Sequence, residues 1–111
     1  MAILAIMRSN KLTREQYDSL RPLVEWEKEY PAGAILHTCA IDPKGGLRIV
    51  DVWESPEQLE TFFKTRLQAG LKKLNLEPPQ MDVYPLYNFN AFPGIETHIP
   101  RGKAKGASAT H

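Results

Sequence analysis

The stretch ILHTCAIDPKGGLRIVDVWESPEQLETFF, residues 35–63, decides the fold of this 111-residue chain. Its centre, Asp42-Pro43-Lys44-Gly45-Gly46, has Asp, Pro and Gly at the positions favoured by a type I turn that closes with a glycine bulge. The turn predicts two antiparallel strands, residues 34–41 and 47–54. Ser55-Pro56 follows at once, with Ser as a helix N-cap and Pro as the first helical residue. The stretch therefore predicts a β-hairpin that leads directly into a helix.

The turn also predicts which residues of the two strands lie opposite each other. If Gly45 is the left-handed bulge residue, counting back gives the opposed pairs Asp42–Gly46, Cys39–Ile49, His37–Asp51 and Ile35–Trp53. Because strand side chains alternate between two faces, one face then carries Ile35, His37, Cys39, Ile41, Leu47, Ile49, Asp51 and Trp53. This pattern predicts a polar pair, His37 and Asp51, beside Trp53 on an apolar wall. We expect this face to line a cavity.

Further elements are predicted outside this stretch. Residues 2–7 are apolar on both faces, which is typical of a central strand in a covered sheet. Thr13 and Gln16 have the capping-box spacing of a helix start, whereas Pro22 predicts either a kink or a helix that ends before it. Residues 81–89 are rich in Val, Tyr and Phe and predict a last strand.

The order of these elements, strand-helix-strand-strand-helix-strand, predicts an α+β fold of the ferredoxin-like type over residues 1–90. In this fold a four-stranded antiparallel sheet carries two helices on one face. Residues 91–111 are polar and rich in Gly, and they predict a flexible tail. Both sheet faces are largely apolar, and the helices cover only one of them. We therefore expect a homodimer, a dimeric α/β barrel, in which two sheets pack together and enclose a cavity in each subunit.

Composition argues against several classes of protein. The net charge is +1 and the basic residues are dispersed, so no nucleic-acid partner is expected. The apolar run at residues 2–7 is too short for a signal peptide or a membrane span, which favours a cytoplasmic protein with no membrane partner. Cys39 is the only cysteine, and no His or carboxylate pair has the spacing of metal ligands. Neither a disulfide nor a metal site is expected.

The junction between the hairpin and the second helix resembles the signature of the antibiotic-biosynthesis-monooxygenase-like domain, in the dimeric α/β-barrel superfamily: Val52-Trp53-Glu54-Ser55-Pro56-Glu57-Gln58-Leu59. The order and the lengths of the predicted elements resemble those of this family over about residues 2–89. The resemblance implies the ferredoxin-like fold and a dimer, and a range of activities: cofactor-free monooxygenases, haem-degrading enzymes, polyketide cyclases and lactone isomerases. The chain departs from the pattern at Phe62, where many members carry a histidine. Fold alone therefore does not settle the activity.

His37 and Asp51 are the candidate catalytic residues. Opposed residues on one sheet face have Cβ atoms about 4.5–5.5 Å apart, close enough for imidazole and carboxylate to hydrogen-bond. The carboxylate would fix the tautomer of His37 and suit it to act as a general base. Alternatively, Asp51 only satisfies a buried histidine. Candidate substrate-binding residues are Trp53, which could stack on an aromatic ligand, and Tyr84, Tyr87 and Asn88, which could hydrogen-bond its carbonyl or oxyanion. Structural roles are the alternative for all of them.

These residues lead to a hypothesis of function. The chain would be a cofactor-independent monooxygenase acting on a small aromatic or polyketide-like molecule, with His37 as the base. The alternative is a non-catalytic dimeric ligand-binding or stress-associated module, which Phe62 favours. A cyclase or isomerase is a weaker alternative. So is haem binding through His37, since a strand histidine already paired with Asp51 is a poor axial ligand.

Overall fold

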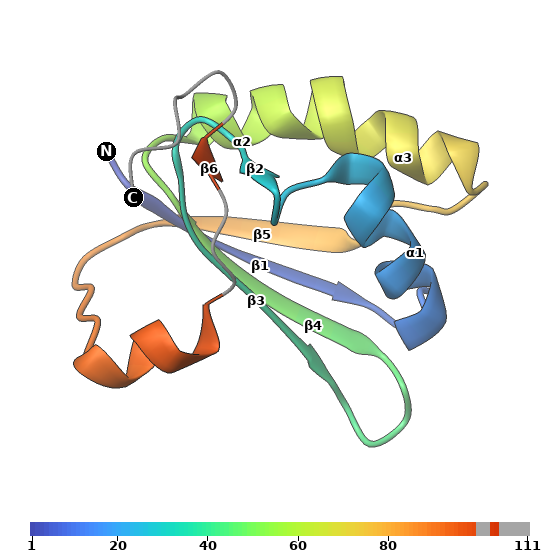
Figure 1. Cartoon of the computed structure of the whole chain (residues 1–111), viewed down its shortest axis with the longest axis horizontal. Coiled ribbons are helices and arrows are strands. Elements are labelled where there is room, and N and C mark those ends of the chain that lie inside the picture. Colours follow the sequence, from blue (N-terminus) through green and yellow to red (C-terminus); the bar gives the residue numbers. More distant parts are fainter. Residues whose placement is uncertain (100–102, 105–111) are drawn as a thin grey trace.

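A computed structural model describes residues 1–99 and 103–104. Its main sheet is antiparallel, with the strand order β3-β4-β1-β5. The strands are β1 (Ile3–Ser9), β3 (Ala34–Ile41), β4 (Leu47–Trp53) and β5 (Gln80–Pro85). The helices are α1 (Arg14–Val24), α2 (Pro56–Phe62), the π-helical η1 (Phe63–Leu67) and α3 (Gln68–Lys73). These helices lie on one side of the sheet (Figure 1), so the predicted ferredoxin-like α+β fold is confirmed.

The helices begin at the predicted capping residues. Thr13 Oγ1 accepts a hydrogen bond from the backbone N–H of Gln16, and the Gln16 side chain accepts one from the backbone N–H of Thr13. At the start of α2, Ser55 Oγ accepts a hydrogen bond from the backbone N–H of Gln58. Pro22 lies inside α1, which continues to Val24, so the expectation that the helix ends before Pro22 is wrong. The helix ends instead where Glu25 adopts a left-handed conformation, with φ at 63°.

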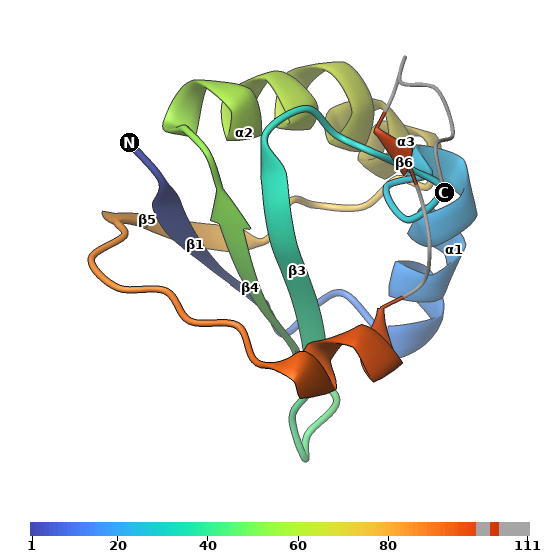
Figure 2. The same ribbon diagram turned by 60° about the vertical axis from the view of Figure 1, so that its left-hand side comes forward.

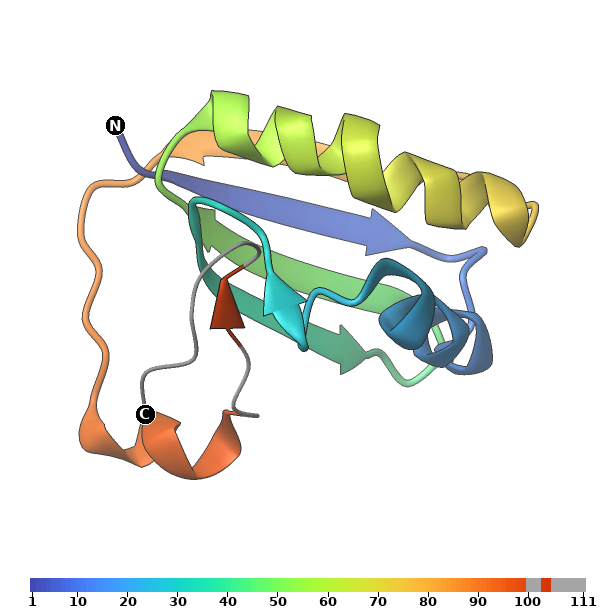
Figure 3. The ribbon, with the colours of Figure 1, turned by 45° about the horizontal axis from the view of Figure 1, so that its top comes forward.

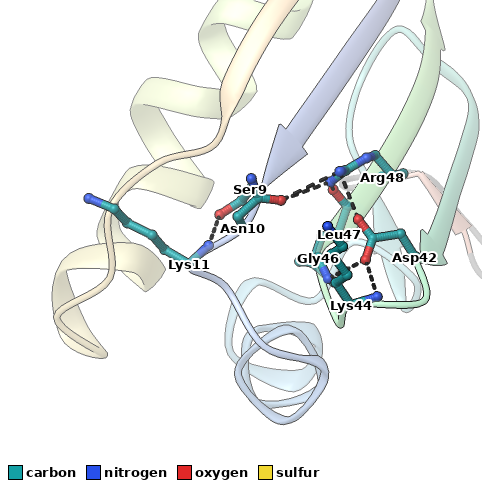
Figure 4. A network of polar contacts seen from close by, with 8 residues as sticks. All are labelled: Ser9, Asn10, Lys11, Asp42, Lys44, Gly46, Leu47 and Arg48. Carbon is teal, nitrogen blue, oxygen red and sulfur yellow. Dashed lines mark hydrogen bonds and ion pairs between the residues drawn. The ribbon is translucent and has the colours of Figure 1, made fainter.

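The hairpin of β3 and β4 has the predicted turn (Figure 4). Gly45 has φ at 91°, and the backbone N–H of Asp42 donates to the carbonyl of Gly46 at 2.9 Å. The pairs Cys39–Ile49 and His37–Asp51 are confirmed.

The register predicted for the far end of the hairpin is wrong. Trp53 lies opposite Ala34 instead of Ile35, because the ladder has an irregularity between Ala34 and Leu36. A β-bulge of this kind places an extra residue in one strand, and here it shifts the pairing by one. The turn could not reveal this shift, since it sets only the register that starts from it.

The core lies between the sheet and the helices. One buried cluster joins β1, β4 and α2 and consists of Ile3, Ala5, Met7, Ile49, Trp53 and Leu59. A second joins α1 to α3 and consists of Leu20, Val24 and Leu71. Trp53 and Ile49 share their strand face with Asp51, so the face that carries His37 and Asp51 is the face covered by helices.

The last predicted strand is shorter than expected, because β5 ends at Pro85 and does not reach Phe89. Pro85 has no N–H to donate to a neighbouring strand. Leu86 then donates its N–H to the carbonyl of Ala2, just before β1 begins. No partner strand extends further in that direction, so the pairing stops.

The segment predicted as a flexible tail, residues 91–111, is only partly described. It includes the 3₁₀ helix η2 (Pro93–His98) and β6 (Lys103–Ala104), which pairs in parallel with β2 (Glu29–Tyr30). Figure 1 shows β6 beside β2, and Figure 2 shows η2 at the bottom of the view, away from β6. Residues 100–102 and 105–111 lie outside the described part, so the flexible tail stays a prediction. In the described part of the chain, no helix is both long and apolar enough to span a bilayer.

Candidate functional site

A cavity of about 490 Å³ lies between the sheet and the helices. Figure 3 shows that α2, η1 and α3 run along one side of the sheet, while α1 lies over the ends of β3 and β4. The walls of the cavity carry six aromatic side chains besides His37: Tyr17, Trp26, Tyr30, Trp53, Phe62 and Phe63. We expected a cavity enclosed by two packed sheets. The structure places it within one chain instead, on the opposite face of the sheet, because the side chains of His37 and Asp51 point towards the helices.

Three polar side chains form a chain of hydrogen bonds at this cavity. Tyr17 Oη lies 2.6 Å from His37 Nε2, and His37 Nδ1 lies 2.7 Å from Asp51 Oδ1. We call these residues the Tyr17–His37–Asp51 chain. The second carboxylate oxygen of Asp51 accepts from Trp53 Nε1 at 3.2 Å. Asp51 is only 5% exposed, so side chains rather than water satisfy its oxygens.

The direction of these hydrogen bonds follows from the chemistry of each group. An ionised carboxylate only accepts, so Nδ1 of His37 must carry the proton that it donates to Asp51. Nε2 of the neutral ring is then an acceptor, and the hydroxyl of Tyr17 donates to it. The tautomer is thus assigned from the hydrogen-bond partners. The lone pair of Nε2 is the basic atom of the site.

Tyr17 was not among the candidate site residues, although a pattern in the sequence points to it. Tyr17, Leu20 and Val24 form the inward stripe of α1. A hydroxyl on such a stripe requires a hydrogen-bonding partner inside the protein. The polar pair on the facing sheet is a suitable partner, but joining the two requires knowing where α1 crosses the sheet.

Burial sets the electrostatics of the site. It raises the pKa of the Tyr17 phenol far above its ordinary value, with a further contribution from the neighbouring Cys39. Tyr17 is therefore a neutral hydrogen-bond donor at any physiological pH. Burial also raises the pKa of the Cys39 thiol, which argues against a thiolate nucleophile.

The structure brings together some of the predicted site residues and separates others. His37, Asp51 and Trp53 line the cavity, as does Trp26, which the sequence did not indicate. Tyr84, Tyr87 and Asn88 are not among its lining residues. Tyr84 lies opposite Leu4 in the register of β1 and β5, on the uncovered face of the sheet. Tyr87 and Asn88 lie beyond the end of β5 and are exposed, so a role for these three would have to be outside the cavity.

The donor set at the site is one of proton transfer rather than metal binding. Among residues 1–99, no group of three or more His, Cys, Asp or Glu is placed to hold a metal ion. The Tyr17–His37–Asp51 chain can take up a proton at Nε2 and stabilise the resulting imidazolium through Asp51. Aromatic walls beside such a base suit a flat ligand with an acidic hydrogen.

The fold is shared with several solved structures. A proposed antibiotic biosynthesis monooxygenase from Chloroflexus aurantiacus is 20% identical, with a TM-score of 0.58 over 81% of this chain and 98% of the other. SnoaB, a cofactor-independent oxygenase from Streptomyces nogalater, is 9% identical, with a TM-score of 0.59 over 79% and 94%. A proposed monooxygenase from Nitrosomonas europaea is 8% identical, with a TM-score of 0.57 over 80% and 94%. No family model matches the chain, and no curated protein matches its sequence. The chain thus has the fold of the antibiotic-biosynthesis-monooxygenase-like proteins.

Proposed function

We propose that this protein is a cofactor-independent monooxygenase that oxidises a small aromatic or polyketide-like molecule. The observation that carries the proposal is the Tyr17–His37–Asp51 chain, which presents a basic nitrogen at an aromatic cavity. The shared fold with SnoaB supports it, since that protein is a cofactor-independent oxygenase.

The reaction begins with removal of a proton from the substrate. His37 Nε2 accepts the proton, and the Asp51 carboxylate stabilises the imidazolium through Nδ1–H. The substrate is left with an electron-rich carbanion delocalised over its aromatic ring. A carbanion of this kind is itself the reductant for O₂, so the reaction needs no other electron donor.

The oxidation balances without a cofactor. A ring CH₂ group and O₂ give a C=O group and water: the carbon loses four electrons and O₂ gains four. The carbanion adds O₂ to form a peroxide, which takes up a proton. The carbon then loses its second proton as the O–O bond breaks, so that one oxygen atom stays in the product as C=O and the other leaves as water. The protein contributes the base and the flat walls. Trp53 has two roles, since its ring lines the cavity and its N–H orients Asp51.

Oxidation of dithranol, an anthrone with an acidic ring CH₂ group, tests the proposal. We expect oxygen uptake and formation of the quinone chromophore in stoichiometric amounts, with both lost by at least about a hundredfold in His37→Ala. Thr38→Ala is the matched control. Thr38 follows His37 in β3, its side chain points to the other face of the sheet, and its hydroxyl donates to the carbonyl of Val50. Unchanged turnover in His37→Ala would contradict the mechanism.

A second candidate function is non-catalytic binding of a flat ligand. It is favoured by Phe62, which lines the cavity where many members of the resembled family carry a histidine. A ligand would then raise the melting temperature without being consumed. The same base would also serve an isomerase or cyclase, in which the proton returns to a different carbon and no O₂ is used. We also propose that two copies of the chain form a homodimer through the uncovered face of the sheet.

A further inference from the structure

Tyr17 occupies the only lone pair that makes His37 a base. The Oη–Nε2 distance of 2.6 Å is at the short end for a hydrogen bond between a hydroxyl and a ring nitrogen. Asp51 keeps the proton of the neutral ring on Nδ1. The ring therefore cannot move its proton to Nε2 and present the lone pair of Nδ1 to a ligand instead. In this arrangement the base is already in use by the protein's own phenol.

Tyr17 is held firmly in this position. Its ring is nearly coplanar with the imidazole, at an interplanar angle of 9°, and packs at 5.5 Å from the ring of Trp26. Trp26 in turn meets His37 edge to face at 5.4 Å. The phenol is therefore placed so that its hydroxyl lies along the lone pair. A substrate hydroxyl that reaches Nε2 has to displace it.

The exchange favours some ligands over others. Breaking one hydrogen bond from a phenol to Nε2 and making another gives almost no net gain when the two hydroxyls are equally strong donors. A more acidic hydroxyl makes a stronger hydrogen bond or transfers its proton outright, and the exchange then becomes favourable. A less acidic alcohol cannot compete.

We propose that Tyr17 is a specificity-determining residue that caps His37, so that the cavity admits phenols and enols more acidic than tyrosine and rejects weaker donors. This inference deepens the proposed function, since it concerns the same base. It can nevertheless be tested by binding alone, without turnover.

Binding of 4-methylphenol, 4-chlorophenol and 4-cyanophenol tests the inference, because these probes are similar in size and increase in acidity in that order. We expect the affinity of the unsubstituted protein, measured by calorimetry, to rise in the same order. In Tyr17→Phe, which removes the competing hydroxyl and keeps the ring, we expect all three probes to bind about threefold to tenfold more tightly. Tyr84→Phe is the matched control, because Tyr84 lies on the uncovered face of the sheet and outside the cavity, and it should leave all three affinities unchanged.

The ¹⁵N signals of the imidazole give a second measurement that does not depend on the variant. 4-Cyanophenol should shift the Nε2 signal of His37 in the unsubstituted protein, and 4-methylphenol should shift it least. Weaker binding in Tyr17→Phe would mean that Tyr17 holds the ligand rather than excluding it, and would overturn the inference. Equal affinity for the three probes, or no binding of any, would overturn it as well. Failure of the unsubstituted protein to oxidise dithranol would count against the proposed function, but it would leave the binding result for Tyr17 unchanged.

Discussion

Asp42 and Asp51 lie on the same hairpin, and both carboxylates accept hydrogen bonds from N–H groups, yet their partners are of different kinds. Asp42 Oδ1 accepts from the backbone N–H groups of Lys44 and Gly46 within its own turn (Figure 4). Asp51 accepts from two side chains, those of His37 and Trp53, in the interior. A local network such as that of Asp42 is encoded by a few consecutive residues. The network of Asp51 exists only once the strands and helices have come together.

The largest difference between the two networks should appear in stability. Asp51→Ala removes the buried carboxylate that accepts from the N–H groups of His37 and Trp53, and it leaves the buried Trp53 N–H without an acceptor. We expect it to lower the free energy of unfolding by about 3 kcal/mol. Asp42→Ala should have a smaller effect, because water can reach the turn and replace the carboxylate. Urea denaturation of both variants measures the difference. Equal losses of unfolding free energy in the two variants would mean that the network of Asp51 contributes no more to stability than the turn network of Asp42.

Alkaline pH should separate the networks next. The pKa of Tyr17 is raised in the folded state above its ordinary value of 10.0, so its contribution to stability is complete below that pH and is lost as pH rises above it. Unfolding free energies should therefore fall more steeply above about pH 10 in the unsubstituted protein than in Tyr17→Phe. Parallel curves would show that the phenol ionises as readily in the folded chain as in the unfolded one.

Acid should have the smallest effect, and it should act through the hairpin turn. The N–H of Gly46 and then that of Lys44 lower the pKa of Asp42 below its ordinary value of 3.8, and Arg48 adds to this. The contribution of Asp42 is therefore present above that pH and is lost as pH falls below it. We expect the stability gap between the unsubstituted protein and Asp42→Asn, measured by urea denaturation at each pH, to narrow as pH falls through 3.8 and further below it. A stability difference that persists in acid would show that it does not come from the ionised carboxylate of Asp42.

The same distinction explains which parts of the structure the sequence could predict. The turn, its glycine, the register through His37 and Asp51 and the helix caps all depend on residues close in sequence. The Tyr17–His37 contact depends on the crossing point of a helix over a sheet, which no local pattern encodes. The bulge at Ile35 and the end of β5 at Pro85 likewise depend on which neighbouring strand is present.

The cavity lies on the side of the sheet that the helices cover, and not on the side where a second subunit would pack. Two apolar sheet faces suggested that a second subunit would enclose the site. The wall is instead completed by aromatic side chains of α1 and of the helical segment that follows Ser55, above all Tyr17 and Phe62. Periodicity shows that these side chains point inward, but it does not show that they stop short of filling the interior.

The bulge between Ala34 and Leu36 separates the register of the His37–Asp51 pair from the start of the hairpin. Every residue inserted in a regular strand turns all the side chains beyond it to the other face. The bulge takes up one such residue before His37 is reached, and the turn sets the register of His37 from the opposite direction. Changes of length in the connection that precedes β3 can therefore accumulate without moving His37 away from Asp51. The His37–Asp51 pair is thus held in register from the turn, independently of the length of the chain before Ala34.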